Sequence, residues 1–252
     1  MATGPFSLEN KTIVVAGASS GIGLSICKAI VECGGKVIGL ARREEKLREM
    51  VEGLGEINAS YIKADLTKDE DIQKVVEMLP EINGYVHATG ILSYQPLKFV
   101  KRELLNQVMS ANYYSAVLML SELVKRKKIK RNLYSSIVLI SSISNQVGSK
   151  SLLAYSSSKG AMSAAGRVMA SELAGQKIRV NTLEPAMVKT DIAVQATEVH
   201  SAEAIEKDVA SYPFGYGTPE DVAYCTVFLL SDASKWITAQ TITLDGGWRT
   251  IV

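Results

Sequence analysis

The chain is poor in the residues on which several protein classes depend, and its charge is almost balanced. Its 252 residues include three cysteines and two histidines, and the formal net charge is +2. Cys27, Cys33 and Cys225 are odd in number and lack the spacing of a metal site or a disulfide framework, which suits a reducing compartment. The small net charge gives no reason to expect a nucleic acid or a membrane as a partner.

Long apolar runs are absent as well. No stretch approaches the roughly 20 apolar residues that a membrane-spanning helix needs. No cleavable signal precedes the first apolar run, which begins near residue 12. We therefore expect a cytoplasmic protein.

The two histidines offer little for acid–base chemistry. His87 ends an apolar run, where a histidine is more often a structural residue with hydrogen-bonded ring nitrogens. His200 lies in an irregular stretch, so a Ser-His-Asp hydrolase has little support. We expect no metal site.

The chain does show a regular alternation of two kinds of segment. Strand-like runs lie near residues 12–17, 36–41, 60–63, 84–88, 136–141, 178–183 and 241–244. Helical patterns lie near 21–32, 44–53, 68–79, 101–126, 153–174 and 219–231. This order predicts a single α/β domain with a parallel sheet covered by helices on both faces. Such sheets bind ligands at the carboxyl ends of their strands, which here carry Gly17, Ala41, Asp65, Gly90, Ser142 and Pro185.

Three glycines follow the first strand-like run, in the pattern Gly17-x-x-x-Gly21-Ile22-Gly23. Glycine lets the backbone turn tightly and approach a pyrophosphate, which the N–H groups of a helix N-terminus can bind. The spacing differs from the G-x-G-x-x-G dinucleotide motif, and no Gly-Lys-Ser/Thr of a P-loop follows. For the glycines alone, a serine-capped turn without a ligand is the alternative.

Tyr155 and Lys159 are four positions apart in a helical pattern, so they share one face of the helix. Ser142, thirteen residues before Tyr155, follows a strand-like run and can reach the same place. A phenol has an ordinary pKa near ~10 and donates a proton poorly at neutral pH. A neighbouring cation can lower that pKa, which makes the three side chains a candidate catalytic group.

The same spacing recurs at Tyr94 and Lys98. Pro96 lies between them and is poorly tolerated inside a helix. Glu81 also stands where a serine would be needed, thirteen residues upstream. We interpret this second pair as accidental.

In these features the chain closely resembles the classical short-chain dehydrogenase/reductase family, from about Asn10 to Val252. The matching residues are Gly17, Gly21, Ile22, Gly23, Asp65, Leu66, Asn112, Ser142, Tyr155, Lys159, Val180, Asn181, Pro185, Thr190, Asp245, Gly246 and Gly247. Within the family the chain is most similar to the 3-oxoacyl-acyl-carrier-protein reductases. The resemblance implies a Rossmann-type, doubly wound parallel sheet of about seven strands in a single domain, 1–252.

The resemblance also implies how this domain is divided. A nucleotide-binding half covers about 10–100 and a catalytic half about 101–188. The irregular stretch of about 189–217 suits a lid over the substrate. A C-terminal helix and strand complete the chain, at 218–252.

The catalytic roles follow from the resemblance. Tyr155 would protonate a carbonyl oxygen as hydride arrives from the nicotinamide, or take a proton in the reverse direction. Ser142 would hydrogen-bond that oxygen, and Lys159 would lower the phenol pKa and bind the nicotinamide ribose. Asn112 matches the asparagine that holds a proton-relay water against the lysine. By itself, however, Asn112 could also be a mid-helix polar residue bonded to backbone.

The second strand-like run indicates which dinucleotide is bound. NAD enzymes of this fold usually place an acid at its end to hold the ribose hydroxyls, whereas this chain has Ala41, Arg42 and Arg43. A guanidinium can bind a 2′-phosphate with two hydrogen bonds. We therefore predict NADP (NADPH), with Arg42 as the main contact. The alternative is that the two arginines form surface ion pairs with Glu44 and Glu45.

The resemblance implies a set of cofactor residues around this position. They are Gly17, Ser19, Ser20, Gly21, Ile22, Gly23, Arg42, Arg43, Asp65, Leu66, Gly90, Tyr155, Lys159, Pro185, Val188 and Thr190. Asp65 could instead, or in addition, cap the helix that begins near Lys68.

The sequence leaves the substrate open. Glu184 precedes Pro185 and could bind substrate hydroxyls or a cation, or face solvent. The basic run Lys125–Arg131 is either a docking surface for an acidic acyl carrier protein or a solvated helix end.

Three functions are in question. The first is an NADPH-dependent carbonyl reductase, with 3-oxoacyl thioesters among its candidate substrates. The second is an oxidoreductase for a sugar-like or polyhydroxylated substrate, favoured if Glu184 lines the pocket. The third, a non-catalytic dinucleotide-binding protein, is disfavoured because Tyr155 and Lys159 are both present.

We also expect a homo-oligomer, either a dimer or the tetramer that the resemblance implies. The helical patterns 101–126 and 153–174 carry more apolar residues than one inward stripe requires. The alternative is that all of them pack against the chain's own sheet. Oligomers of this kind are closed and symmetric, so a two-fold axis between paired helices is the natural arrangement.

Overall fold

The computed structural model describes residues 4–131, 134–190 and 202–250. Seven parallel strands form one sheet in the order β3-β2-β1-β4-β5-β6-β7. They are β1 Thr12–Ala16, β2 Lys36–Ala41, β3 Ala59–Lys63, β4 Gly84–His87, β5 Ser135–Ile140, β6 Ile178–Pro185 and β7 Thr241–Leu244. The predicted doubly wound Rossmann-type fold is therefore confirmed.

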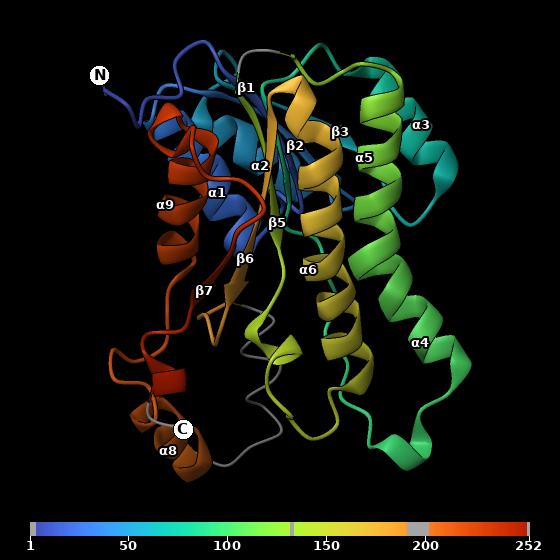
Figure 1. Ribbon diagram of the computed structural model, residues 1–252, viewed down its shortest axis with the longest axis vertical. Helices are drawn as coiled ribbons and strands as arrows, with labels where there is room; N and C mark the ends of the chain where they lie inside the picture. Colours follow the sequence, from blue (N-terminus) through green and yellow to red (C-terminus); the bar gives the residue numbers. More distant parts are fainter. Residues whose placement is uncertain (1–3, 132–133, 191–201, 251–252) are drawn as a thin grey trace.

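Helices cover both faces of the sheet (Figure 1). One face carries α1 Gly21–Glu32, α2 Glu44–Leu54 and α9 Pro219–Leu230. The other carries α3 Asp69–Met78, α5 Ser115–Lys125 and α6 Leu153–Leu173. Within the described part of the chain, no helix is both long and apolar enough to cross a membrane.

The central strand β1 shows why the strands are continuous apolar runs. Val14 and Ala16 pack in the core beneath α3, α5 and α6, whereas Ile13 and Val15 pack beneath α1, α2 and α9. All four side chains are fully buried. Because successive side chains point to opposite faces and both faces are covered, each of these four positions must be apolar.

The single helix predicted over 101–126 is wrong in one respect. The structure has α4 Arg102–Met109, a π-helical turn Ser110–Tyr114 and then α5. A π turn takes one more residue than an α turn and is frequent at functional sites. The apolar pattern does not reveal it, because helix continues on both sides of the turn.

The stretch 189–217 is partly outside the described residues, which omit 191–201. Its remainder holds a helix that the sequence analysis did not expect, α8 Ala202–Ala210. Val188 pairs with Gly217 in an isolated parallel bridge, so the two ends of the stretch lie side by side. α8 lies beyond the carboxyl ends of the strands (Figure 1).

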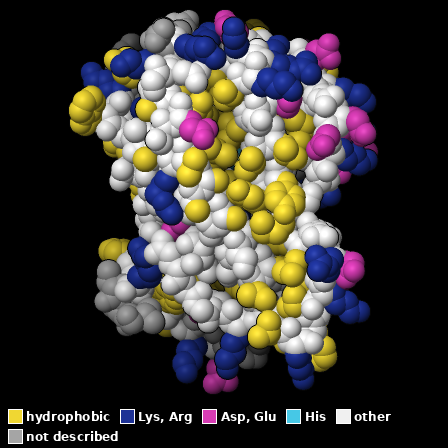
Figure 2. Space-filling view, turned by 45° about the vertical axis from the view of Figure 1, so that its right-hand side comes forward, with side chains coloured by type: hydrophobic (Ala, Val, Ile, Leu, Met, Phe, Trp, Pro, Cys, Tyr) yellow, Lys and Arg dark blue, Asp and Glu magenta, His cyan; other side chains and the backbone are white. Residues whose placement is uncertain are grey.

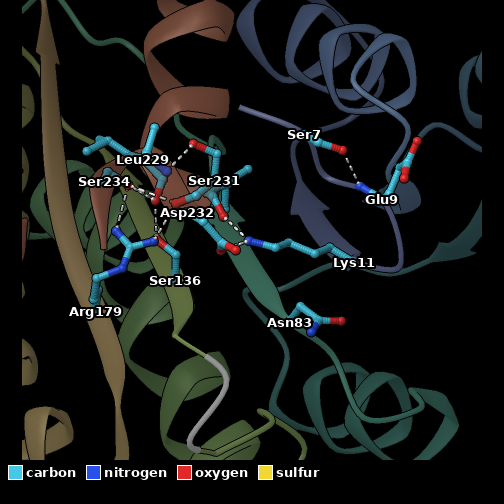
Figure 3. Close-up of polar contacts among 12 residues, drawn as sticks. Ser7, Glu9, Lys11, Asn83, Ser136, Arg179, Leu229, Ser231, Asp232 and Ser234 are labelled. Atoms are coloured by element: carbon cyan, nitrogen blue, oxygen red, sulfur yellow. Dashed lines mark hydrogen bonds and ion pairs between the residues drawn. The ribbon is translucent and has the colours of Figure 1, made fainter. Parts of the chain in front are cut away.

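Polar contacts hold together the opposite, amino-terminal edge of the sheet (Figure 3). Arg179, near the start of β6, is buried, and its guanidinium donates to the Ser234 hydroxyl at 2.9 Å and the Ser231 carbonyl at 3.2 Å. Burial lowers the pKa of Arg179 to about 10, against the opposing effect of Asp232. Lys11, before β1, pairs with Asp232 at 2.6 Å. These contacts fasten the segment after α9 to the strands at the edge away from the candidate site.

Candidate functional site

A cavity of about 1110 Å³ lies at the carboxyl ends of the strands. Its wall includes every residue to which the sequence analysis assigned cofactor binding, from Gly17 to Thr190. Ser142 also belongs to the wall, so three of the four predicted catalytic residues face one cavity. Asn112 does not line it. The fold thus brings together residues that lie far apart in the sequence.

The glycine turn after β1 needs glycine for two separate reasons. Gly17 has a φ of +90°, and a Cβ there would lie 2.8 Å from the carbonyl carbon of Ala88. A Cβ on Gly23 would lie 2.1 Å from the carbonyl oxygen of Gly17. The turn therefore holds the N-terminus of α1 close to β4, in the cavity wall. The helix cap residue Ser20 makes no side-chain capping bond, and this N-terminus suits a pyrophosphate.

Two arginines line the cavity beside the glycine turn. The Arg43 guanidinium donates to the Ser19 hydroxyl at 3.0 Å and to the Ser20 hydroxyl at 2.6 Å. Arg42 is exposed and also lines the cavity. Both cations are thus placed where an anionic group of a dinucleotide could meet them.

The alternative that these arginines pair with the acids after them is not observed in the described residues. Glu44 pairs instead with Lys63 at 3.1 Å and with Arg48 at 3.8 Å. No ion pair joins Arg42 or Arg43 to Glu44 or Glu45 in this part of the chain.

Asp65 does not cap the helix that follows it, so that alternative is wrong. The cap position of α3 is Lys68, which makes no side-chain capping bond. Asp65 instead accepts hydrogen bonds from the Thr67 N–H at 3.1 Å and the Thr67 hydroxyl at 2.8 Å. Partial burial acts to raise the pKa of Asp65, but these bonds and the charge of Arg42 lower it. Asp65 therefore stays ionised in the cavity wall.

Tyr155 and Lys159 lie on one side of α6, as their spacing predicted. The Lys159 Nζ is 5.7 Å from the centre of the Tyr155 ring and donates to the Ile140 carbonyl at 2.9 Å. Burial lowers the pKa of Lys159 to about 8.

The protein alone does not lower the pKa of Tyr155. Burial raises it, a hydrogen bond with Ser142 opposes that rise, and the nearby Tyr94 adds to it. Removal of the phenolate from water is the largest effect, so the groups of the protein itself keep the phenol protonated. A lowered pKa stays a prediction for the cofactor-bound protein.

Asn112 is fully buried in the π-helical turn and bonds to the loop after β4. Its Oδ1 accepts from the Ile91 N–H at 2.7 Å, and its Nδ2 donates to the Ile91 carbonyl and to the Ser158 hydroxyl, each at 3.0 Å. A Cβ on Gly90 would lie 3.3 Å from both Asn112 Oδ1 and Lys159 Nζ. These contacts agree with the alternative in which Asn112 is a polar helix residue bonded to backbone. The backbone in question is that of Ile91, in the loop after β4.

His87 is a buried structural residue, as expected. Its Nδ1 lies 2.7 Å from the Tyr85 hydroxyl, and its Nε2 lies 2.7 Å from the Thr89 hydroxyl. Burial and the charge of Lys159 lower its pKa to about 3, so the ring is neutral. His200 lies outside the described residues. In the part of the chain that the structure describes, no group of three or more His, Cys, Asp or Glu side chains could hold a metal ion.

Aromatic side chains that the sequence analysis missed form another part of the cavity wall. The Tyr212 ring stacks on Trp248, with centroids 5.7 Å apart and planes at 17°, and meets Tyr216 edge-on at 5.1 Å. The Tyr216 hydroxyl donates to Asp208. Tyr94, dismissed with its accidental motif, lines the same cavity. These residues lie in turns and short segments without a periodic pattern, so only the fold reveals their proximity.

Glu184 neither faces solvent nor lines the cavity, so the solvent-facing alternative is wrong. The residue is 1% exposed. Its carboxylate accepts from the Ser163 hydroxyl at 2.6 Å, from the Asn145 amide at 2.7 Å and from the Gln146 amide. The condition that favoured a sugar-like substrate, Glu184 in the pocket, is not met.

The basic run Lys125–Arg131 lies at the amino-terminal edge of the sheet. Its first two cations pair with Glu122, and Lys128 donates to backbone carbonyls at the end of α3. Ile129 pairs with Ile82, just before β4 begins. The cavity lies past the other end of β4, so the run does not border it.

Comparison with known proteins places the chain in a family. A family profile described as enoyl-(acyl carrier protein) reductase matches residues 17–249. A solved structure of a short-chain type dehydrogenase/reductase from Mycobacterium ulcerans has a TM-score of 0.88 and 28% identity, and the match covers 97% of this chain and 91% of that one. The chain belongs to the short-chain dehydrogenase/reductase family.

Curated relatives of similar length act on different compounds. The chain is 31% identical over 254 residues to a 3-oxoacyl-[acyl-carrier-protein] reductase FabG from Chlamydia pneumoniae, covering 96% of this chain and 98% of that protein. It is 29% identical over 247 residues to an NAD-dependent glycerol dehydrogenase from Listeria innocua, covering 96% and 95%. The structure of a proposed gluconate 5-dehydrogenase from Beutenbergia cavernae, with NADP bound at low occupancy, is 31% identical with a TM-score of 0.87, covering 98% and 100%.

The family decides the general class of activity. The protein is an oxidoreductase that acts on alcohol or carbonyl groups, and its cofactor is a nicotinamide dinucleotide. Because its relatives include both an NAD-dependent and an NADP-bound protein, family membership does not choose between the two dinucleotides.

Proposed function

We propose that the protein is an NADPH-dependent carbonyl reductase, which in the reverse direction is an alcohol dehydrogenase. One observation carries the proposal: a single cavity joins the glycine turn at the N-terminus of α1 to Ser142, Tyr155 and Lys159. A helix N-terminus with a glycine turn suits a pyrophosphate, and a phenol beside a lysine suits proton transfer to oxygen. When bound, the nicotinamide supplies or accepts the hydride.

In this proposal the protein's own residues handle the proton. Tyr155 gives its proton to the carbonyl oxygen, and its raised pKa keeps that proton in place until transfer. Ser142 hydrogen-bonds the same oxygen and keeps it beside the phenol. Lys159 stabilises the phenolate that remains and holds the cofactor ribose. Asn112 acts indirectly, because it fixes the loop after β4 next to Lys159.

The preference for NADPH rests on the charges at the end of β2. No carboxylate stands at Ala41 to hold ribose hydroxyls or to repel a phosphate. Arg42 and Arg43 both line the cavity there, and Arg43 is held by the serines of the glycine turn. We assign Arg42 as the main contact of the 2′-phosphate, because its guanidinium has no carboxylate partner among the described ion pairs.

For the substrate we propose a small ketone with an apolar or planar body, 3-oxoacyl thioesters included. The stacked rings of Tyr212 and Trp248 and the edge of Tyr216 provide a wall of that character. The segment that contains α8 and Tyr212 forms the lid of this site. A polyhydroxylated substrate is second, since Glu184 is engaged elsewhere. The Lys125–Arg131 run gives no support for an acyl carrier protein as partner, because it lies at the opposite edge of the sheet.

We also propose that the protein is a cytoplasmic homotetramer. Of the apolar residues on α5, Ala116, Met119 and Leu123 are buried in the chain's own core, as the alternative supposed. Leu118 and Val168, however, are 42% and 57% exposed. Hydrophobic side chains gather on this face of α4 to α6 (Figure 2), which suits a second copy of the chain. All three cysteines are free, which supports the reducing cytoplasm.

The Tyr155→Phe variant tests the proposed function. It should lower kcat for NADPH-dependent reduction by at least about 100-fold, because it removes the proton donor. The dissociation constant of NADPH, followed by nucleotide fluorescence, should change little. Tyr224→Phe, at an exposed tyrosine on α9, is the matched control. Wild-type turnover is measured as loss of NADPH absorbance with acetoacetyl thioesters, simple ketones and keto-sugars. Near-full activity of Tyr155→Phe would contradict the mechanism.

A further inference from the structure

Glu184 is a buried acid to which the proposed mechanism gives no role. It lies near the end of β6, directly before Pro185, and is 1% exposed. Three side chains donate to its carboxylate: Asn145 and Ser163 to Oε1, at 2.7 Å and 2.6 Å, and Gln146 to Oε2. All three groups act as donors, so each directs a hydrogen toward the Glu184 carboxyl oxygens. Glu184 thus fixes the orientation of groups from two segments, the turn after β5 and α6.

One hydrogen-bond chain from Glu184 leads to Ser142. The Asn145 amide that donates to Glu184 also donates to the Ser142 backbone carbonyl at 2.6 Å. Asn145 ends the short 3-10 turn Ile143–Asn145, for which Ser142 is the cap residue. The carboxylate therefore holds the turn that sets the direction of the Ser142 side chain.

A second contact of Glu184 reaches the helix that carries Tyr155 and Lys159. Ser163 lies on α6, and its hydroxyl donates to Glu184 at 2.6 Å. The Ser163 oxygen is also 2.9 Å from the Ser141 oxygen, and the Ser141 hydroxyl donates to the backbone carbonyl of Lys159 at 2.8 Å. Glu184 therefore joins the end of β6 to α6.

We propose that Glu184 is a positioning residue for the reductase reaction, which fixes Ser142 relative to Tyr155 and Lys159. The inference rests on the proposed function. Ser142 comes from the end of β5 and the other two residues from α6, so their relative placement depends on contacts between these elements. The bonds from Asn145, in the turn after β5, and from Ser163, on α6, meet at one oxygen of Glu184. A misplacement of about 1 Å at a reacting group can cost on the order of 100-fold in rate.

Gln146 provides a way to test this role by exchange. Its amide NH2 donates to Glu184, and its amide oxygen accepts from Arg249. In Glu184→Gln the new amide oxygen can keep the bonds to Asn145 and Ser163, but its NH2 then faces the NH2 of Gln146. Adding Gln146→Glu replaces that second NH2 by a carboxylate, which accepts from the new amide and from the Arg249 guanidinium. The double variant therefore restores the hydrogen bond between positions 184 and 146, with the amide and the carboxylate exchanged between them.

We expect Glu184→Gln to lower kcat by about 10- to 100-fold while KM for the ketone and the dissociation constant of NADPH change less than about threefold. The double variant Glu184→Gln/Gln146→Glu should recover kcat to within about fivefold of wild type. Gln146→Glu alone should also lose kcat, because it sets two carboxylates against each other. Glu70→Gln, at an exposed acid on α3, is the matched control. A purely structural loss would instead lower the fraction of folded, NADPH-binding protein at constant kcat per binding site.

Ser163→Ala covers the case in which Glu184→Gln does not fold. It removes only the hydrogen bond that joins Glu184 to α6, and it should lower kcat several-fold with KM unchanged. Full kcat in folded Glu184→Gln, no recovery in the double variant, or full kcat in Ser163→Ala would each overturn the positioning role alone. A wild-type protein that binds NADPH but reduces no carbonyl compound in the panel would overturn the proposed function, and the positioning role with it.

Discussion

Burial acts on Tyr155 and Lys159 of α6 in opposite directions, because their charged forms carry opposite signs. It lowers the pKa of Lys159 from 10.5 to about 8 and raises that of Tyr155. Each group is thus held toward its neutral form. For a reductase this keeps the phenol proton available, while the lysine charge depends on conditions near physiological pH.

The lysine shift predicts a pH-dependent stability. The folded state disfavours the Lys159 ammonium, so the cost of burying it is fully present below about pH 8 and disappears as pH rises toward 10.5. Lys159→Met should therefore be more stabilising near pH 7 than near pH 10, by about 2–3 kcal/mol at ~1.36 kcal/mol per pKa unit. Urea unfolding of both proteins at the two pH values measures the difference. The exposed Lys235→Met controls for loss of a cation, and an equal effect at both pH values would contradict the argument.

Arg42 is the residue on which cofactor choice should depend. We expect the wild-type protein to bind NADPH more tightly than NADH, and Arg42→Ala to weaken NADPH binding about 10- to 100-fold, the loss of one charge-assisted bond of about 1.5–3 kcal/mol. NADH binding should hardly change. Fluorescence titration with both cofactors measures this, with Arg48→Ala, on the outer part of α2, as the control. Equal or tighter binding of NADH by the wild-type protein would show that the arginines do not select the phosphate.

At the scale of elements, the segment α4–π–α5 shows how one irregular turn serves the site. The π turn places Asn112 in the core, where its amide satisfies both backbone groups of Ile91. The loop after β4 has no strand partner at that point, so these bonds replace those of a sheet. The π turn therefore fixes the loop after β4, which forms part of the cavity wall.

This arrangement predicts the effect of removing the amide. Asn112→Leu should destabilise the protein by about 2–6 kcal/mol, because it leaves the Ile91 N–H and carbonyl without partners at about 1–3 kcal/mol each. Asn106→Leu, the same change at an exposed position of α4, should cost far less. Urea unfolding free energies of the two variants provide the comparison. Similar values for both would mean that the loop does not depend on Asn112.

At the scale of the whole molecule, the exposed apolar face of α4 to α6 predicts self-association. Light scattering should give four times the 27.2 kDa of one chain at micromolar concentration. Leu118→Lys combined with Val168→Lys should reduce that mass, because each lysine would have to be desolvated between copies. Ile57→Lys, at an 85% exposed position after α2, is the control. A fully active 27.2 kDa monomer would contradict the proposal.

Much of the fold and of the site could be predicted from sequence, for local reasons. Apolar runs alternating with helical patterns specify strands and helices, and parallel strands with covering helices allow few arrangements. Gly17 and Gly23 could be recognised because no other residue fits their turn. Tyr155 and Lys159 could be paired because four residues on a helix are one turn. Ser142 could be added because strand ends meet at one edge of the sheet.

Tertiary structure alone decided the features that depend on contacts between distant segments. The bonds of Glu184 to Asn145 and Ser163 join three elements, and nothing near Glu184 in the sequence indicates whether it faces solvent, cavity or core. Tyr94 and Tyr212 both line the cavity, although neither belongs to a periodic pattern. The pKa of Tyr155 likewise follows from burial, which residue spacing does not measure. Sequence determines local geometry through periodicity and sterics, whereas desolvation and long-range hydrogen bonds exist only once the chain has packed.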